Sequence, residues 1–188
     1  MNKELKIMFK IGFSLLALLL IIINGHSWIA HKRTLPGTDS SFQVAVNRLR
    51  HPQLNHPSEL ARYPRLKGQP ALYLVAIRKE RRLYVISGHQ VLYIVNARIN
   101  LSPVTLHINH SRGNQIFNQN NNVQQVGTNW LSLSQADTFI EAPVEVNNHR
   151  VHGNWLHARY HCANTIDVSK PDAYWLQDLP AGTRLVIK

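Results

Sequence analysis

Short apolar runs separated by polar or glycine-bearing breaks dominate the second part of the sequence. Residues 72–77, 83–86 and 91–95 are apolar, and residues 78–81 and 87–90 between them are charged or contain glycine. Runs of this length, bounded by turn residues, are typical of antiparallel strands joined by hairpins. Further strands are expected at 104–108, 130–133, 138–140, 144–146 and 184–187. The pattern predicts a mainly β domain over residues 71–188.

Two segments of this domain differ from the strand pattern. Residues 169–172 read Ser-Lys-Pro-Asp, a Ser-x-x-Asp capping sequence with proline in the first turn, which predicts one short C-terminal helix. Residues 114–125 are rich in Asn and Gln, and we expect them to form an exposed loop.

The longest apolar run lies near the N-terminus. Residues 11–23 are almost entirely apolar, and apolar residues return at 28–30. A helix over residues 11–30 would rise by about 30 Å, the thickness of the hydrocarbon core of a bilayer. Residues 1–33 therefore predict a membrane anchor with one transmembrane helix. A cleaved signal peptide is the alternative, because lysines precede the run and small residues follow it.

The segment between the anchor and the β domain has a different composition. Residues 34–70 contain five prolines and few consecutive apolar positions. Such a composition resists regular structure, so we expect a Pro-rich linker that holds the domain away from the membrane.

Charge and cysteine content narrow the possible partners. The chain of 188 residues has 21 Lys and Arg against 10 Asp and Glu, a net charge of +11. This excess favours polyanionic surroundings such as nucleic acid, anionic lipid or a phosphate-rich wall. Nucleic acid is disfavoured among these, because the basic residues form no stripe with interleaved aromatic residues. The single cysteine, Cys162, excludes an internal disulfide and a Cys-rich zinc site.

The histidines and Cys162 are the candidate chemical groups. Four of the eleven histidines cluster at 149, 152, 157 and 161, but the glutamate of an H-E-x-x-H site is missing. We therefore expect no metal and no cofactor. Cys162 directly follows His161, and a thiol held beside an imidazole is the arrangement of Cys-His catalysis. Neighbouring side chains on a strand point to opposite faces, so Cys162 taken alone fits a buried small apolar residue better.

The C-terminal residues carry a family resemblance. Residues 169–176 (SKPDAYWL) and 179–187 (LPAGTRLVI) resemble the end of the L,D-transpeptidase catalytic domain of the YkuD type. In that family a helix bearing Asp-Ala and Trp-Leu is followed by Pro-x-Gly-Thr and an apolar strand. Weaker similarities, two of them to segments of lactic-acid-bacterial members, lie at 83–85, 90–93, 102–106, 112–118 and 130–132. The resemblance spans roughly residues 71–188 and implies an L,D-transpeptidase-like β-sandwich.

The resemblance also implies a catalytic signature, which this chain does not reproduce. Family members cross-link peptidoglycan stem peptides outside the cell through a cysteine acyl-enzyme, and carbapenems acylate that cysteine. The signature is an upstream His, then Ser-His-Gly-Cys and a nearby Arg or Asn. Counted back without gaps from Asp172, the Ser-His-Gly-Cys positions hold Cys162, Ala163, Asn164 and Thr165. In the same register Asp167 replaces the Arg and Ile140 replaces the upstream His.

Two functional hypotheses follow from the two possible registers. In the first, the chain is a catalytically degenerate, membrane-anchored protein whose domain lies outside a Gram-positive cell and binds peptidoglycan or an anionic wall polymer, or assists an active partner. A second register shifts the signature by three residues and pairs His161 and Cys162 with the family's His-Gly-Cys. His152 would then be the base of an active L,D-transpeptidase with Cys162 as its nucleophile.

Overall fold

Ten strands and one short α-helix make up the body of the structure. The computed structural model describes residues 12–22, 46–120, 122–153, 155–157 and 162–188. The strands are β1 (Leu72–Ile77), β2 (Arg82–Ser87), β3 (Gln90–Asn96), β4 (Arg98–Ile99), β5 (Thr105–Asn120), β6 (Val123–Leu133), β7 (Phe139–Val146), β8 (His149–Arg150), β9 (Thr165–Asp167) and β10 (Arg184–Ile187). A 3-10 turn η1 (Trp155–His157) and the helix α3 (Lys170–Leu176) complete the domain. The mainly β prediction is confirmed.

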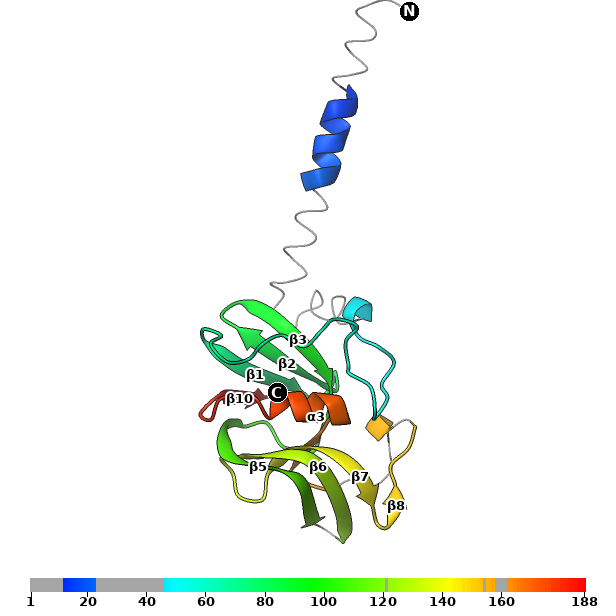
Figure 1. Ribbon diagram of the computed structural model, residues 1–188, viewed down its shortest axis with the longest axis vertical. Helices are drawn as coiled ribbons and strands as arrows, with labels where there is room; N and C mark the ends of the chain where they lie inside the picture. Colours follow the sequence, from blue (N-terminus) through cyan, green and yellow to red (C-terminus); the bar gives the residue numbers. More distant parts are fainter. Residues whose placement is uncertain (1–11, 23–45, 121, 154, 158–161) are drawn as a thin grey trace, which may run out of the picture.

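The described strands are hydrogen-bonded in one mixed, continuous order that divides into two halves. Their order is β3-β2-β1-β10-β5-β6-β7-β9-β4, and β8 pairs with β7. Strand β10 joins the two halves, because it pairs in parallel with β1 and antiparallel with the start of β5. A register shift in β5 between Ile108 and Arg112 separates the residues that contact β10 from the long hairpin with β6. Helix α3 lies between the two halves (Figure 1).

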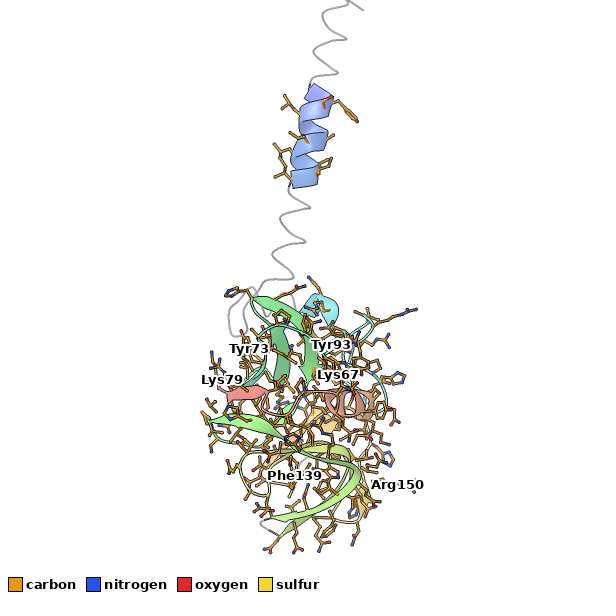
Figure 2. The ribbon with its side chains drawn as sticks, turned by 60° about the vertical axis from the view of Figure 1, so that its left-hand side comes forward. Lys67, Tyr73, Lys79, Tyr93, Phe139 and Arg150 are labelled. Carbon is orange, nitrogen blue, oxygen red and sulfur yellow. The ribbon has the colours of Figure 1, made fainter. Side chains whose placement is uncertain are left out.

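A single apolar core connects both halves of the sheet with the helix. It includes Leu74 and Val85 from the first half, Leu131 and Ile140 from the second, and Leu176 from α3, all fully buried. Figure 2 shows Tyr73 and Tyr93 in the half formed by β1–β3, and Phe139 in the other half. Alternation along the strands therefore sends one face of each half toward α3.

The N-terminus of α3 follows the predicted capping sequence. The Ser169 hydroxyl accepts a hydrogen bond from the Asp172 N–H at 3.3 Å and donates one to the Asp172 carboxylate at 2.6 Å. Proline in the first turn needs no hydrogen-bond partner for its nitrogen. The predicted helix is confirmed.

The expected loop at residues 114–125 is wrong. Residues 114–120 belong to β5 and residues 123–125 to β6, and these two strands pair with each other. Their amide side chains are compatible with strands because some of them face other polar groups: Asn118 and Gln125 both donate to Glu141. The polar composition of this segment predicted an exposed loop. Whether such a segment forms a strand depends on the residues that face it on the neighbouring strand, which composition does not show.

Residues 48–66, which we call the strap, lie against the domain. This part of the predicted linker covers the open edge of β3 with side chains: Glu59 Oε1 accepts from Ile94 N–H at 2.6 Å, and Ser58 Oγ accepts from Asn96 N–H at 2.8 Å. Arg48 pairs with Glu59 at 2.7 Å. Prolines do not prevent such docking, because side-chain contacts to an edge strand need no backbone ladder from the strap.

The strap is also fixed to α3. Asp172 accepts hydrogen bonds from the Ser58 hydroxyl at 2.6 Å and the Tyr63 hydroxyl at 2.8 Å. The Tyr63 ring stacks on Trp175 with centroids 4.9 Å apart, and Trp175 Nε1–H donates to Pro64 O at 3.0 Å. The strap therefore behaves as part of the domain.

The described part of the N-terminal apolar run is helical over residues 12–22. Among the residues that the structure describes, no helix has the length and apolar character needed to cross a membrane. The predicted span over 11–30 continues through residues that lie outside the described ranges.

Candidate functional site

Strands β7 and β9 carry three of the six predicted signature positions, Ile140, Thr165 and Asp167. They pair in parallel, with Phe139 opposite Thr165, Ile140 opposite Ile166 and Glu141 opposite Asp167. Ile140 and Ile166 point into the apolar core and are 0% exposed. Because side chains alternate along a strand, Thr165 and Asp167 lie on the opposite face, which they share with Phe139 and Glu141 of β7 and not with Ile140.

A cluster of buried polar side chains occupies that face. Gln125 links two carboxyl groups, because its Nε2–H donates to Glu141 Oε1 at 2.6 Å and to Asp167 Oδ1 at 3.0 Å. Asn100 Nδ2–H donates to Asp167 Oδ2 at 3.1 Å and to Thr165 Oγ1 at 2.9 Å. Glu141 and Asp167 are 0% and 1% exposed. Arg98 lies opposite Asp167 in the pairing of β4 with β9, and its positive charge acts to lower the pKa of Asp167.

The Glu141 side chain reaches across strand β6 to its partner on β5. Its Oε2 accepts from Asn118 Nδ2–H at 2.7 Å. The intervening β6 residue is Gly127, where an added Cβ would lie only 2.5 Å from the Glu141 carboxyl carbon. Glycine at this position is therefore required for the close approach of the carboxyl group.

Burial makes both carboxyl groups weak acids. Desolvation, followed by the nearby Asp167 carboxyl, raises the pKa of Glu141 to about 8. Desolvation also raises the pKa of Asp167, against the opposing effects of the hydrogen bond from Gln125 and the positive charge of Arg98. The two groups share Gln125 and titrate as a pair, so at least one proton stays on the pair at neutral pH.

Cys162 lies at the edge of this polar cluster. It is 1% exposed, its N–H donates to Gln125 Oε1 at 3.1 Å, and its sulfur lies 3.9 Å from Val123 O. Burial, with smaller contributions from Glu141 and Asp167, raises the pKa of the thiol to about 11. Thr165 Oγ1–H donates to Cys162 O at 3.0 Å. Neither signature position presents an activated nucleophile.

The remaining candidate residues occupy different surroundings. Ala163 and Asn164 are half-buried in the turn before β9. His152 is exposed and lies in the separate cleft described below. His161 lies outside the described residues. Among the described residues, no three His, Cys, Asp or Glu side chains form a group that could hold a metal ion.

Asn164 has the backbone conformation of a glycine position. Its φ of 61° lies in the left-handed region, which glycine and asparagine tolerate and β-branched residues do not. Its N–H donates to Asn100 O at 3.1 Å, and its carbonyl accepts from Phe139 N–H at 3.2 Å, so the turn is fixed from both sides.

This conformation predicts a contrast between two substitutions. Asn164→Gly is expected to change the free energy of unfolding by less than about 0.5 kcal/mol, and Asn164→Val to lower it by about 1–3 kcal/mol, because only valine is strained at this φ. Urea unfolding of both variants measures the difference. Equal stability of the two variants would contradict the assigned conformation.

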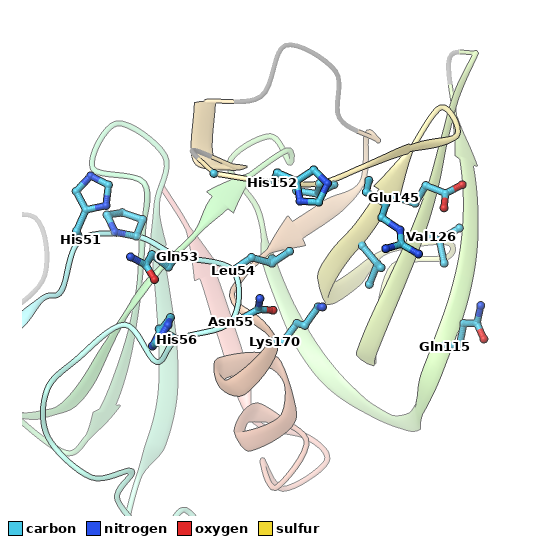
Figure 3. A pocket seen from close by; sticks show the side chains of 15 residues that line it. His51, Gln53, Leu54, Asn55, His56, Gln115, Val126, Glu145, His152 and Lys170 are labelled. Carbon is cyan, nitrogen blue, oxygen red and sulfur yellow. The ribbon is translucent and has the colours of Figure 1, made fainter.

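A separate open cleft lies on the face of the sheet next to α3. It has a volume of about 850 Å³ and opens between strap residues 51–56 and strands β6, β7 and β8. The labelled side chains around it are His51, Gln53, Leu54, Asn55 and His56 on one wall, Gln115, Val126 and Glu145 on the other, His152 above and Lys170 between the walls (Figure 3). The strap therefore forms one wall of this cleft.

Sequence reasoning missed Gln125, Glu141 and the cleft. The alternation within β7 placed Glu141 on the face opposite Ile140, and this was the available signal for Glu141. Gln125 lies in the Asn- and Gln-rich segment that was expected to form a loop, so no buried role was predicted for it. The cleft has no local signal, because its walls come from segments about 60 to 120 residues apart.

Comparisons with known proteins give structural similarities only. No protein-family model matches the sequence, and no curated protein is significantly similar to it. The fold is similar to a fused Zn-dependent amidase/peptidase/peptidoglycan-binding domain-containing protein of Clostridium acetobutylicum, with 18% identity over 63% of this chain and 52% of that one (TM-score 0.46). L,D-transpeptidase 1 of Mycobacterium tuberculosis shares 13% identity over 63% of this chain and 61% of that one (TM-score 0.47). A mutant L,D-transpeptidase of Enterococcus faecium shares 10% identity over 62% and 49% of the two chains (TM-score 0.49).

The chain spans about half to three fifths of the length of these solved structures. Similarities of this size do not assign the chain to a family. Its function therefore has to be argued from its own residues.

Proposed function

We propose that this chain is a cell-envelope protein with an L,D-transpeptidase-like domain that binds peptidoglycan or another anionic wall polymer and does not perform cysteine acyl transfer. The observation that carries the proposal is the state of Cys162. Its thiol is buried beside two carboxyl groups, and its pKa is raised to about 11.

A thiol in this environment is a poor nucleophile. The thiolate is the reacting form, and with a pKa of about 11 roughly one thiol in ten thousand is ionised at pH 7. Catalytic cysteines have lowered pKa values next to a cation, an imidazolium or a helix N-terminus. Cys162 has the opposite surroundings, because Glu141 and Asp167 disfavour its negative charge.

Thr165 does not replace the cysteine as a nucleophile. Its hydroxyl hydrogen is used in the bond to Cys162 O, and its oxygen accepts from Asn100. A threonine hydroxyl needs a general base as its hydrogen-bond acceptor, and the Thr165 hydroxyl donates to a backbone carbonyl instead. The signature positions therefore support a degenerate site.

Local structure supports the register on which the family resemblance depends. Asn164, aligned with the glycine of the signature, has a φ of 61°. The closing helix α3 and strand β10 follow in the expected order, and β7 and β9, which carry the other signature positions, are adjacent. The net charge of +11 suits an anionic polymer. A membrane tether through residues 11–30 remains a prediction.

Mass spectrometry and wall binding test the two parts of the proposal. The full chain and Cys162→Ser are incubated with a carbapenem, and an active L,D-transpeptidase serves as the positive control. We expect no adduct on either form while the control is labelled, and we expect both forms to sediment with purified cell wall. A stable adduct on the wild-type chain that is absent from Cys162→Ser would establish acyl chemistry, and failure to sediment would refute wall binding.

A further inference from the structure

Two basic side chains, Lys170 and Arg150, line the cleft between the strap and the sheet. Neither side chain forms an ion pair or hydrogen bond within the described residues. Glu145 is the one carboxylate among the lining residues; it lies opposite Arg150 in the pairing of β7 with β8 but forms no ion pair with it, so the formal charge of the lining is positive with neutral histidines. Concave sites with converging unpaired charges are typical of ligand binding.

The two cations come from different elements and enter the cleft from different sides. Lys170 is the first residue of α3 and lies between the two walls (Figure 3), whereas Arg150 belongs to β8, which pairs with the end of β7. Lys170 is also held in place by its backbone, because its N–H donates to Leu54 O of the strap at 2.8 Å. A fixed backbone lowers the entropy cost of presenting this ammonium group to a ligand.

The other lining residues are suited to a ligand polymer that has both polar groups and an apolar surface. Gln53 and Asn55 from the strap and Gln115 from β5 offer amide donors and acceptors. Leu54 and Val126 contribute apolar surface. Amides match hydroxyl and peptide groups, and the lysine and arginine match oxyanions.

We propose that this cleft is an anion-binding site in which Lys170 and Arg150 hold a carboxylate or phosphate group of a polymer whose backbone contacts the amides, with the strap forming one wall. That the ligand is a cell-wall polymer rests on the proposed function. The location of the site rests only on the lining of the cleft. The site is separate from Thr165 and Asp167, whose side chains lie on the other face of the sheet.

Charge-removing variants of the full chain test the site. Binding is measured by fluorescence anisotropy with two labelled probes, a purified muropeptide carrying free carboxylates and a synthetic glycerol-phosphate oligomer. Lys170→Gln and Arg150→Gln are each expected to weaken binding of the preferred probe about tenfold, and Lys170→Arg to keep most of it. Lys79→Gln is the matched control, because Lys79 is exposed on the β1–β2 turn, away from Arg150 (Figure 2). The control is expected to stay within about twofold of the wild type.

The preferred probe identifies the source of the oxyanion, and hydrogen exchange locates the contact. Binding is expected to slow amide exchange in strap residues 51–56 and not in the turn at residues 78–81. Equal affinity of all variants, or protection away from the strap, would overturn the site while leaving wall binding intact. Absence of binding to both probes would overturn the site as well, and sedimentation with whole wall would then judge the proposed function separately.

Discussion

Replacing Asp172 with alanine is expected to lower the free energy of unfolding by about 3–5 kcal/mol. Asp172 is 0% exposed and accepts hydrogen bonds from Ser58, Tyr63 and Ser169. Alanine would remove the acceptor for all three hydroxyl groups. Ser58 and Ser169 are buried and Tyr63 is half-buried, and a buried polar group without a partner costs about 1–3 kcal/mol. Urea unfolding measures the loss.

The substitution is also expected to release the strap before the sheet unfolds. Ser58 connects Asp172 with the edge of β3, so the bond to α3 and the bond to the strand depend on one side chain. Limited proteolysis should therefore cut within residues 48–66 faster in Asp172→Ala than in the wild type. Asp172→Asn keeps one acceptor oxygen, so its rate of cleavage within the strap should lie between those of the wild type and Asp172→Ala.

Asp178→Ala serves as the matched control for this variant. Asp178 is exposed just beyond α3, and its removal is expected to change stability by less than about 0.5 kcal/mol. A loss of stability in Asp172→Ala no larger than in this control would show that the strap is not held through α3.

The parts of the fold that the sequence predicted are those with local signals. The apolar runs of β1 and β10 are bounded by turn residues, and the cap of α3 is contained in four consecutive residues. The residues that determine each of these elements lie within the element or directly beside it in the sequence. The order of the strands in the sheet has no such signal, since β10 pairs with β1 although about 110 residues separate them.

The parts that the sequence did not predict depend on partners far along the chain. Glu59 accepts from Ile94, and Ser58 accepts from Asn96, 35 and 38 residues away. Prolines on either side of these residues indicated an extended linker, and nothing local shows that an edge strand will meet it. The same holds for Gln125, whose two carboxyl partners come from β7 and β9. The choice between the catalytic alternatives also depended on which side chains share a face of the sheet. The register of β7 and β9 shows that Ile140 and Thr165 lie on opposite faces.

The carboxyl pair makes the protein less stable as the pH rises. In the folded protein the pKa of Glu141 is raised to about 8, whereas its ordinary value is 4.5. Below pH 4.5 the group is protonated in both states, so its contribution to stability is fully present there. Between pH 4.5 and 8 the unfolded chain releases the proton and the folded chain retains it, so the contribution is lost progressively as the pH rises. Asp167, whose pKa is also raised, acts in the same direction.

Glu141→Gln is therefore expected to remove most of this loss. From pH 5 to pH 9 the wild type should lose on the order of 3–5 kcal/mol more unfolding free energy than the variant, because glutamine is not ionised in either state. Glutamine still accepts from Gln125 and donates to Asn118 once the Asn118 amide is turned over. Glu145→Gln is the control, because Glu145 lies on the same strand and its replacement leaves the carboxyl pair in place. This variant should lose unfolding free energy with rising pH as steeply as the wild type. Denaturation in urea across this pH range measures all three proteins, and parallel curves for the wild type and Glu141→Gln would mean that Glu141 is ionised in the folded protein at neutral pH.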